Sequence, residues 1–277
     1  MNLAVIIPAA GASTRYARAA AAEQGVEIAR SKLDEDLGGR PVLHRTIELF
    51  ANLAVEGVDV CAIIVPGPAD PAAMAAFKAR HGDKLGLLGC RVCPGGVTHR
   101  YETVRNAIAL VPPAATHVAI HDAARPCASP ELIERVLRAA ERHPAVVPGL
   151  PVADTIKRVA PDPIADDAPD PLAAILGADA SKRGPSLRAV EATLDRTHLV
   201  AAQTPQVFAA ELIRRAYAQT NLDSTDDAQL VERLGQRVVV VPGEARNLKL
   251  TVPSDLALAR AVLGLRGPES RPAHLKF

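Results

Sequence analysis

The chain has 277 residues, of which 48% are hydrophobic, so it is long enough to bury a sizeable core in one large or two small domains. The 32 Lys and Arg residues nearly balance the 31 Asp and Glu residues, which gives no overall electrostatic reason to expect nucleic acid as the main partner. No apolar run approaches the roughly 20 residues that cross a bilayer, and no secretion signal opens the chain, so we expect a cytoplasmic protein without a membrane partner.

Short apolar runs alternate with helical patterns along the first two thirds of the chain. The runs are rich in β-branched residues, as in strands, and the segments between them carry apolar residues at helical spacing. Apolar strands that alternate with helices predict a mostly parallel sheet covered by helices on both faces. In chain order, we expect a strand at 2–9, a helix at 40–53, a strand at 58–66, a helix at 71–81, a strand at 87–93, a helix at 99–111, a strand at 116–122 and a helix at 129–143.

Two helix starts and one cysteine pair can be interpreted directly. "SPELIE" predicts that Ser129 is an N-cap with a proline at the first helical position, and "VPSDLALARAVL" predicts that the last helix starts near Pro253. "CRVC" contains Cys90 and Cys93, but a zinc site usually needs four ligands and a redox pair would begin a helix. We therefore expect buried or half-buried thiols, and the four cysteines of the chain favour a reducing compartment over a disulfide framework.

Residues 160–186 interrupt the alternating pattern. Proline, aspartate and alanine dominate this segment, which favours a projecting loop or arm over a core element. The flanking stretches "ADTIKRV" (153–159) and "LRAVEATLD" (187–195) alternate like strands, so we expect them to pair as a hairpin. We expect the last residues, 265–277, to form a flexible tail.

The stretch "VIIPAAGASTR" (5–15) has almost no side chains where its strand ends. Parallel sheets bind ligands beyond the carboxyl ends of their strands, and bare backbone there lets N–H groups approach an anion. Arg15 follows and can supply positive charge, which predicts a phosphate-bearing ligand. An ordinary tight turn between a strand and a helix remains the alternative, since the stretch matches neither of the common glycine-rich phosphate motifs.

Further polar residues follow the later strands. "PGG" again exposes backbone, and "HDAARP" contains Asp122, which suits a metal ion or a substrate hydroxyl, and Arg125, which suits a phosphate. A surface ion pair is the alternative for these two residues. "QTPQ", "STDDAQLVE" and "NLKLT" add hydroxyls, acids and Lys249, and together these segments predict a site that handles phosphate. His121 is expected to orient the loop after its strand rather than to act as a base.

The sequence resembles the 2-C-methyl-D-erythritol 4-phosphate cytidylyltransferases of the non-mevalonate isoprenoid pathway. The resemblance covers roughly residues 3–263 and rests on "PAAGASTR", "GGVTHRYETV", "HDAARPC", "PVADTIKRV", "TLDR", "QTPQVF", "STDDAQLVE" and "NLKLTVPSDLALA", which occur in the family's order and at about its spacing. It implies a Rossmann-like (GT-A-like) α/β nucleotidyltransferase fold in one domain, residues 1–264. It also implies a homodimer formed through a projecting arm, residues 153–193.

The resemblance implies that CTP and 2-C-methyl-D-erythritol 4-phosphate react to give 4-diphosphocytidyl-2-C-methyl-D-erythritol and pyrophosphate. A phosphate monoester has a second pKa near 6, so the attacking oxygen is already ionised at neutral pH and needs no general base. This agrees with the absence of a recognisable Ser/His/Asp or Cys/His arrangement. The reaction requires in-line positioning and stabilisation of charge on phosphorus.

The family's motifs assign roles to individual residues. Magnesium or another divalent cation is implied to bridge the phosphates, with Asp122 near the ribose, the attacking phosphate or the metal. The other implied roles are Arg15, Lys32 and Lys249 around the triphosphate, the backbone of Ala9, Ala10, Gly11 and Gly96 with the Thr103 hydroxyl around the cytidine, and Arg125, Thr155, Arg196 and Thr225 around the acceptor, with Thr155 and Arg196 contributed by the partner subunit.

Three departures from the family pattern leave alternatives open. The segment between Arg15 and Lys32 is longer than usual, and "SKL" stands in place of the expected Pro-Lys-Gln. After Gly96 the family's acidic residue is missing, the spacer is longer, and Thr103 replaces a serine. The third departure is the lengthened arm. The nearest alternative is a cytidylyltransferase for ribitol 5-phosphate or another pentitol phosphate, a broader one is a sugar-nucleotide pyrophosphorylase that uses another base, and a third is a non-catalytic dimer that retained the fold.

Overall fold

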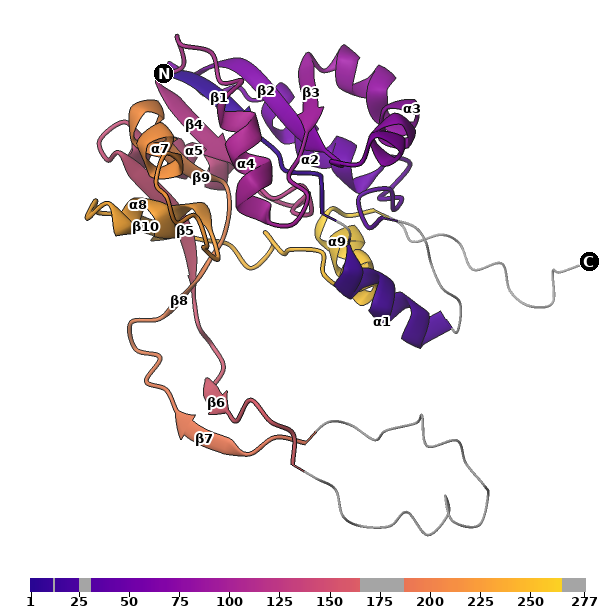
Figure 1. Cartoon of the computed structure of the whole chain (residues 1–277), viewed down its shortest axis with the longest axis vertical. Helices are drawn as coiled ribbons and strands as arrows, with labels where there is room; N and C mark the ends of the chain where they lie inside the picture. Colours follow the sequence, from indigo (N-terminus) through magenta and orange to yellow (C-terminus); the bar gives the residue numbers. More distant parts are fainter. Residues whose placement is uncertain (12, 25–30, 165–186, 266–277) are drawn as a thin grey trace, which may run out of the picture. The chain divides into compact units, whose positions relative to one another are not determined.

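The computed structural model describes residues 1–11, 13–24, 31–164 and 187–265 (Figure 1). The chain divides into two compact units, one formed by Met1–Leu150 with Ala202–Phe277 and the other by Pro151–Ala201. Most of the proline-rich segment 160–186, and all but the first residue of the expected tail 265–277, lie outside the described residues. No helix in the described parts of the chain is long and apolar enough to cross a membrane.

A mixed sheet forms the centre of the larger unit. β1 and its neighbours β2 and β4 run parallel, as do the pairs β2 with β3 and β5 with β10, whereas β9 lies antiparallel between β4 and β5. The strand order is β10-β5-β9-β4-β1-β2-β3, and β8 pairs with β5, so the expectation of a mixed, mostly parallel sheet is confirmed. The strands are β1 (Asn2–Ile6), β2 (Asp59–Gly67), β3 (Cys90–Pro94), β4 (His117–Ile120), β5 (Ala145–Pro151), β8 (Val200–Ala202), β9 (Gln206–Ala209) and β10 (Val239–Pro242).

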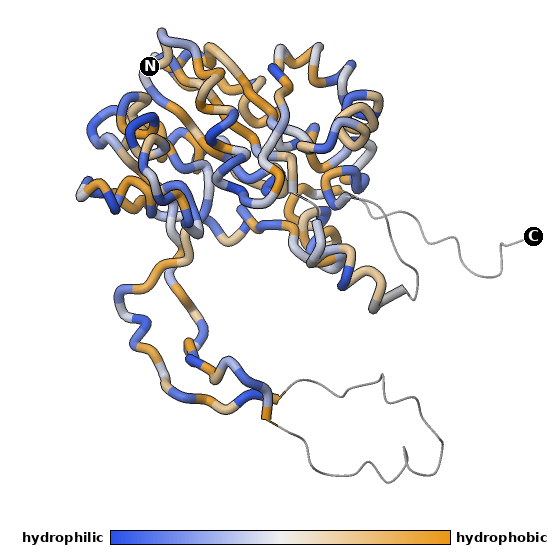
Figure 2. Tube along the Cα trace, viewed as in Figure 1, coloured by the Kyte–Doolittle hydropathy of each residue, from blue (hydrophilic) through white to orange (hydrophobic). Residues whose placement is uncertain are grey.

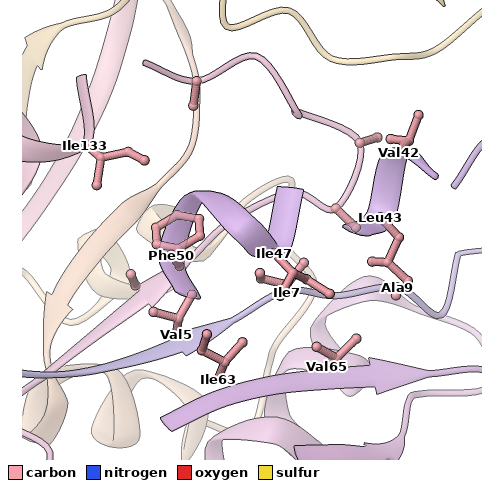
Figure 3. Close-up of a cluster of buried hydrophobic side chains, with 14 of the residues drawn as sticks. Val5, Ile7, Ala9, Val42, Leu43, Ile47, Phe50, Ile63, Val65 and Ile133 are labelled. Atoms are coloured by element: carbon pink, nitrogen blue, oxygen red, sulfur yellow. The ribbon is translucent and has the colours of Figure 1, made fainter. Parts of the chain in front are cut away.

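Buried side chains form one hydrophobic core on each face of this sheet. Successive residues of a strand point to opposite faces, so Val5 joins the core that contains α2 (Val42–Ala51), while Ile6 joins the core that contains α4 (Arg100–Ile108) and α7 (Ala210–Tyr217). Figure 3 shows Val5 and Ile63 of the sheet beneath Ile47 and Phe50 of α2. Both faces of the parallel strands are therefore covered, as near-continuous apolar runs require.

The helices follow from apolar periodicity and from caps. The helices are α1 (Thr14–Gln24), α2 (Val42–Ala51), α3 (Pro71–Leu87), α4 (Arg100–Ile108), α5 (Pro130–Ala140), α7 (Ala210–Tyr217), α8 (Asp227–Arg233) and α9 (Ser254–Val262). Ser129 caps α5, since its hydroxyl accepts a hydrogen bond from the Leu132 N–H at 3.0 Å, and α9 begins directly after Pro253, so both predicted starts are confirmed. α3 runs further than expected because buried His81 and Leu85 continue its apolar stripe.

The cysteine prediction is also confirmed. Cys90 is half-buried, Cys93 is buried, and neither forms a disulfide. Burial raises the pKa of Cys90 to about 11 and also raises that of Cys93, so both thiols stay protonated near neutral pH.

The smaller unit contains the predicted hairpin. β6 (Lys157–Val159) pairs antiparallel with β7 (Val190–Thr193), with Lys157 opposite Thr193. No residue of either strand is buried, and Val190 is 59% exposed. Figure 2 shows hydrophobic and hydrophilic residues interspersed along this unit. An isolated two-stranded hairpin is marginally stable in water, so the described part of this unit lacks a core of its own.

Candidate active site

A cavity of about 550 Å³ lies at the carboxyl ends of three strands of the larger unit. Gly11 lines it after β1, Gly96 after β3 and Asp122 after β4, so the turns singled out in the sequence converge on one space. Ligand sites of small molecules commonly occupy some 300–1,000 Å³, and open α/β sheets place them at this end of the strands. The cavity is therefore the candidate active site.

Two glycine turns shape the floor of the cavity. A side-chain carbon at Gly96 would lie 2.2 Å from a carbon of Glu102, and one at Gly95 would lie 2.4 Å from that of Ala10, so neither position accepts a larger residue without a shift. Gly11 differs, because no atom of the residues that the structure describes lies within 4 Å of the equivalent position. Gly95 and Gly96 are thus required by close packing, whereas Gly11 keeps space open for a ligand.

The turn after β3 is fixed by α4. The Gly96 N–H donates to the Thr103 hydroxyl at 2.9 Å, and the Glu102 carboxylate accepts from the N–H groups of Thr98 and His99 at 2.9 and 3.1 Å. These two backbone hydrogen bonds lower the pKa of Glu102. The Thr103 hydroxyl can still donate its own proton, so the expected nucleoside contact is available to it.

Asp122 lies at the centre of a cluster of cations. Its carboxylate is 3.0 Å from the Lys249 ammonium, 3.1 Å from Arg125 Nε and 3.8 Å from Arg100 Nε. Burial by itself raises the pKa of Asp122, but the charges of Lys249, Arg100 and Arg125 outweigh it and hold this pKa well below the usual range. Asp122 therefore stays ionised and balances only part of the positive charge around it.

Lys32 reaches the same cavity from a distant part of the sequence. Its ammonium donates to the Leu250 carbonyl at 2.8 Å, and the Leu250 N–H donates to the Ala124 carbonyl at 2.9 Å. Leu250 stands between Lys249 and Thr251, which both line the cavity. The structure thus brings Lys32 and Lys249 to one wall, and this wall suits a polyphosphate.

Other predicted residues lie elsewhere. Arg125 is behind Asp122, 9% exposed, and donates to the Asn247 carbonyl at 2.7 Å, so it supports the cavity wall rather than lining it. Ala9 lies below the floor and donates its N–H to the Pro66 carbonyl at 2.8 Å.

Thr225, Thr155, Arg196 and Arg15 are not among the described residues that line the cavity. Thr225 is exposed in the larger unit, and its N–H donates to the Gln229 side chain at 2.9 Å. Thr155 and Arg196 are exposed in the smaller unit. Arg15 lies in the first turn of α1, and its side chain is outside the described part of the chain, as are residues 25–30 of the insertion before Lys32.

Arg100 is a site residue that was not predicted from the sequence. This side chain lines the cavity and forms two hydrogen bonds, of 3.0 and 2.7 Å, with the carboxylate of buried Asp227, which also accepts from the Tyr217 hydroxyl. Burial by itself lowers the pKa of Arg100, but Asp227 more than offsets this, so the guanidinium stays charged. A basic residue that opens a helix four positions after Gly96 was the available signal.

His121 serves the fold. It is fully buried, and burial lowers its pKa to about 4, so its ring is neutral. The Arg125 carbonyl can only accept, so the Nε2 atom of the neutral ring carries the proton and donates to this carbonyl at 3.0 Å. Nδ1 is therefore an acceptor, and Thr204 Oγ1 donates to it at 3.2 Å while accepting from the Asp122 N–H at 3.0 Å. His121 thus joins both ends of the loop that carries Asp122, in agreement with the expected structural role.

The described residues contain no group of three or more His, Cys, Asp or Glu side chains that could hold a metal ion alone. Asp122 is the one carboxylate among the described residues that line the cavity. Magnesium is often held by one or two carboxylates together with substrate phosphates. The donor set therefore fits a divalent cation that is held mainly by the phosphates of a bound nucleotide.

Comparison with known proteins now gives the family. The profile described as "IspD: 2-C-methyl-D-erythritol 4-phosphate cytidylyltransferase" matches residues 3–170 and 166–265. The chain is 36% identical over 272 residues to the 2-C-methyl-D-erythritol 4-phosphate cytidylyltransferase of Acidobacterium capsulatum, covering 96% of this chain and 99% of that protein. It is 37% identical over 268 residues to the enzyme of the same name from Saccharopolyspora erythraea, covering 95% and 100%.

Solved structures agree with the sequence relatives. The crystal structure of 2-C-methyl-D-erythritol 4-phosphate cytidylyltransferase from Thermus thermophilus superposes with a TM-score of 0.64 at 30% identity, covering 96% of this chain and 100% of that one. The structure of 4-diphosphocytidyl-2C-methyl-D-erythritol synthase from Anaerococcus prevotii gives a TM-score of 0.66 at 25% identity, covering 95% and 98%. The expected nucleotidyltransferase fold is confirmed, and the chain belongs to the 2-C-methyl-D-erythritol 4-phosphate cytidylyltransferase family.

Proposed function

We propose that this chain joins CTP and 2-C-methyl-D-erythritol 4-phosphate to give 4-diphosphocytidyl-2-C-methyl-D-erythritol and pyrophosphate. The observation that carries the proposal is the convergence of Lys32, Arg100 and Lys249 on one cavity, with Arg100 and Lys249 beside the carboxylate of Asp122. Family membership over nearly the whole chain supplies the identity of the two substrates.

The chemistry asks the chain for position and charge. The phosphate oxygen of the acceptor attacks the α-phosphorus of CTP, and its second pKa near 6 means that no side chain has to remove a proton. Lys32 and Lys249 flank the triphosphate and stabilise the negative charge that develops as pyrophosphate leaves. Asp122 holds Lys249 in place, and Arg15, at the start of α1, joins the same set.

The nucleoside occupies the glycine-lined end of the cavity in this proposal. Backbone at Ala10, Gly11 and Gly96 contacts the cytidine closely, with the Thr103 hydroxyl as a directed hydrogen-bonding group. Ala9 contributes indirectly, because its N–H donates to the Pro66 carbonyl and so holds the backbone that leads to Ala10 and Gly11. A divalent cation, most simply magnesium, would be held by Asp122 and the phosphates and would neutralise part of their charge.

We further infer that the acceptor contacts Thr225 together with Thr155 and Arg196 of a partner subunit, while Arg125 acts by holding Asp122. Residues 153–193 then serve as the dimerisation arm of a single domain, residues 1–264. The support is the apolar surface of the hairpin, where Val190 is 59% exposed and Ile164 52% exposed, which a second copy of the chain would cover.

We also infer a cytoplasmic location, because all four cysteines are free thiols.

The decisive test is pyrophosphate release by the purified chain with CTP and magnesium. Three reactions run in parallel, with 2-C-methyl-D-erythritol 4-phosphate, with ribitol 5-phosphate and with no acceptor. The proposal expects release with the first alone. Release with ribitol 5-phosphate alone would keep the mechanism and replace the substrate, and no release with either, despite measurable CTP binding, would establish a non-catalytic protein.

A further inference from the structure

Residues 31–41 form the segment that carries Lys32 to the cavity, and this segment has little regular structure of its own. It is held by the buried side chains of Leu33 and Leu37 and by backbone hydrogen bonds, such as that from the Val42 N–H to the Glu35 carbonyl at 3.0 Å. Lys32 lies on the cavity side of the segment. Its position therefore depends on whatever fixes the backbone on either side of it.

On its other side, the segment is attached to α3 by a buried histidine. His81 is 1% exposed, and its Nε2 lies 2.8 Å from Asp34 Oδ1, two residues after Lys32. Arg80, on the preceding position of α3, contacts the second oxygen of the same carboxylate. Burial by itself raises the pKa of Asp34, but the His81 hydrogen bond and the Arg80 charge lower it overall, so Asp34 is an ionised acceptor.

A second histidine completes the arrangement from α2. His81 Nδ1 lies 3.0 Å from His44 Nε2, so the two rings share one hydrogen bond. Because the carboxylate of Asp34 only accepts, His81 Nε2 must carry a proton, and a single further proton lies between the two rings. Asp34, His81 and His44 thus form a hydrogen-bonded network, the Asp34–His81–His44 network, that joins the Lys32 segment, α3 and α2.

The charged groups that face the Asp34–His81–His44 network come from each element packed around it. Arg80 and Lys84 belong to α3, and Glu48 of α2 pairs with Lys84 at 3.2 Å and with Arg40 at 2.7 Å. Burial, followed by the charges of His81 and Lys84, lowers the pKa of His44. Near neutral pH the Asp34–His81–His44 network therefore keeps its two hydrogen bonds.

Packing alone does not require the Asp34–His81–His44 network, since Phe77 already joins α3 to the core, and Leu33 and Leu37 join the segment to it. A buried polar network is stabilising only when every member is paired, and it then specifies one geometry. We propose that His81 is a positioning residue of the transferase site, which through Asp34 fixes the backbone that carries Lys32 to the cavity. The inference rests on the proposed function in so far as Lys32 acts on the triphosphate.

The test is a double-mutant cycle between His81 and Lys32. Turnover and CTP affinity are measured for the unchanged chain, His81→Phe, Lys32→Ala and the double variant, with His117→Phe as the matched control. His117 is a half-buried histidine on β4 that bonds the Ala140 carbonyl at 3.2 Å and does not line the cavity. His81→Gln is included because its amide can still donate to Asp34.

We expect His81→Phe to lower kcat about 10-fold with a smaller change in KM for CTP, since misplaced catalytic groups lose transition-state contacts first. In the Lys32→Ala background the same substitution should change kcat by less than about 2-fold, because the effects share one route. His81→Gln should retain most of the turnover, and His117→Phe all of it. An equal loss in both backgrounds, or no loss in the unchanged background, would overturn the inference.

CTP affinity keeps the two proposals distinguishable. If the unchanged chain binds CTP without turnover, the proposed function fails, and the same cycle is read in the dissociation constant for CTP. If it does not bind CTP, inorganic triphosphate is the probe. A weakening by His81→Phe that disappears in the Lys32→Ala background would still support positioning, whereas equal weakening in both backgrounds would refute it.

Discussion

Replacing Arg100 by methionine removes both hydrogen bonds that this side chain makes with Asp227, and leaves a carboxylate that is 0% exposed with the Tyr217 hydroxyl as a remaining donor. Breaking a buried ion pair by removing one partner typically costs about 3–5 kcal/mol. The Arg100 side chain is 34% exposed, so water can reach part of the vacated space and the lower end of that range applies. We therefore expect a loss of about 3 kcal/mol, or roughly 6–12 °C in Tm.

Urea and thermal unfolding, followed by circular dichroism, would measure this loss. Asp227→Asn in the Arg100→Met background serves as the companion, because it removes the unpaired charge while keeping the shape. The double variant should be more stable than the sum of the two single losses predicts, by at least about 1 kcal/mol. A loss below about 1 kcal/mol for Arg100→Met, or additive losses, would refute the account in which the buried Asp227 carboxylate depends on Arg100 for its pairing.

Further predictions concern the cavity and the loop around it. Lys249→Ala should lower kcat on the order of 10²-fold or more with a smaller effect on KM for CTP, and exposed Lys78→Ala should not; similar kinetics for the two would remove Lys249 from the mechanism. Gly96→Ala should destabilise the protein by about 1–3 kcal/mol, because the new carbon would lie 2.2 Å from a carbon of Glu102. Gly11→Ala should leave the stability unchanged and raise KM for CTP. Thermal unfolding that shows Gly11→Ala to be the less stable of the two would contradict this. The pKa of His121 is about 4 in the folded protein against 6.5 ordinarily, so between these pH values the unfolded chain binds a proton that the folded protein does not. The free energy of unfolding should therefore fall by about 3 kcal/mol as the pH drops from 6.5 to 4. Urea titrations of His121→Gln should lack this part of the fall.

The first half of the sheet could be predicted because its strands are buried on both faces. β1, β2 and β4 are uninterrupted apolar runs, and helices with clear apolar stripes separate them. β5 was not predicted, since Pro148, Gly149 and Pro151 give it the composition of a turn although it lies between two other strands. The antiparallel direction of β9 was not predictable either, because direction depends on where the chain returns to the sheet and not on local pattern.

The site could be predicted as a set of strand ends but not as a set of contacts. Asp122 and Lys249 were both singled out, yet nothing local indicates that their side chains lie 3.0 Å apart. Arg125 was expected at the ligand because arginine suits phosphate, whereas the Asp122 carboxylate and the Asn247 carbonyl hold it behind the wall. Arg100 was missed because its partner Asp227 lies 127 positions away in the sequence.

The wall of the cavity that carries Lys249 is assembled from a late part of the sequence. The Leu250 carbonyl holds Lys32, the Leu250 N–H binds the Ala124 carbonyl, and the Asn247 carbonyl holds Arg125. A chain that ends before Asn247 lacks Lys249 and the Leu250 carbonyl that holds Lys32. We therefore expect such a truncated chain to bind CTP more weakly than the full chain, because the lysine wall of the cavity forms only when this late part of the sequence is present.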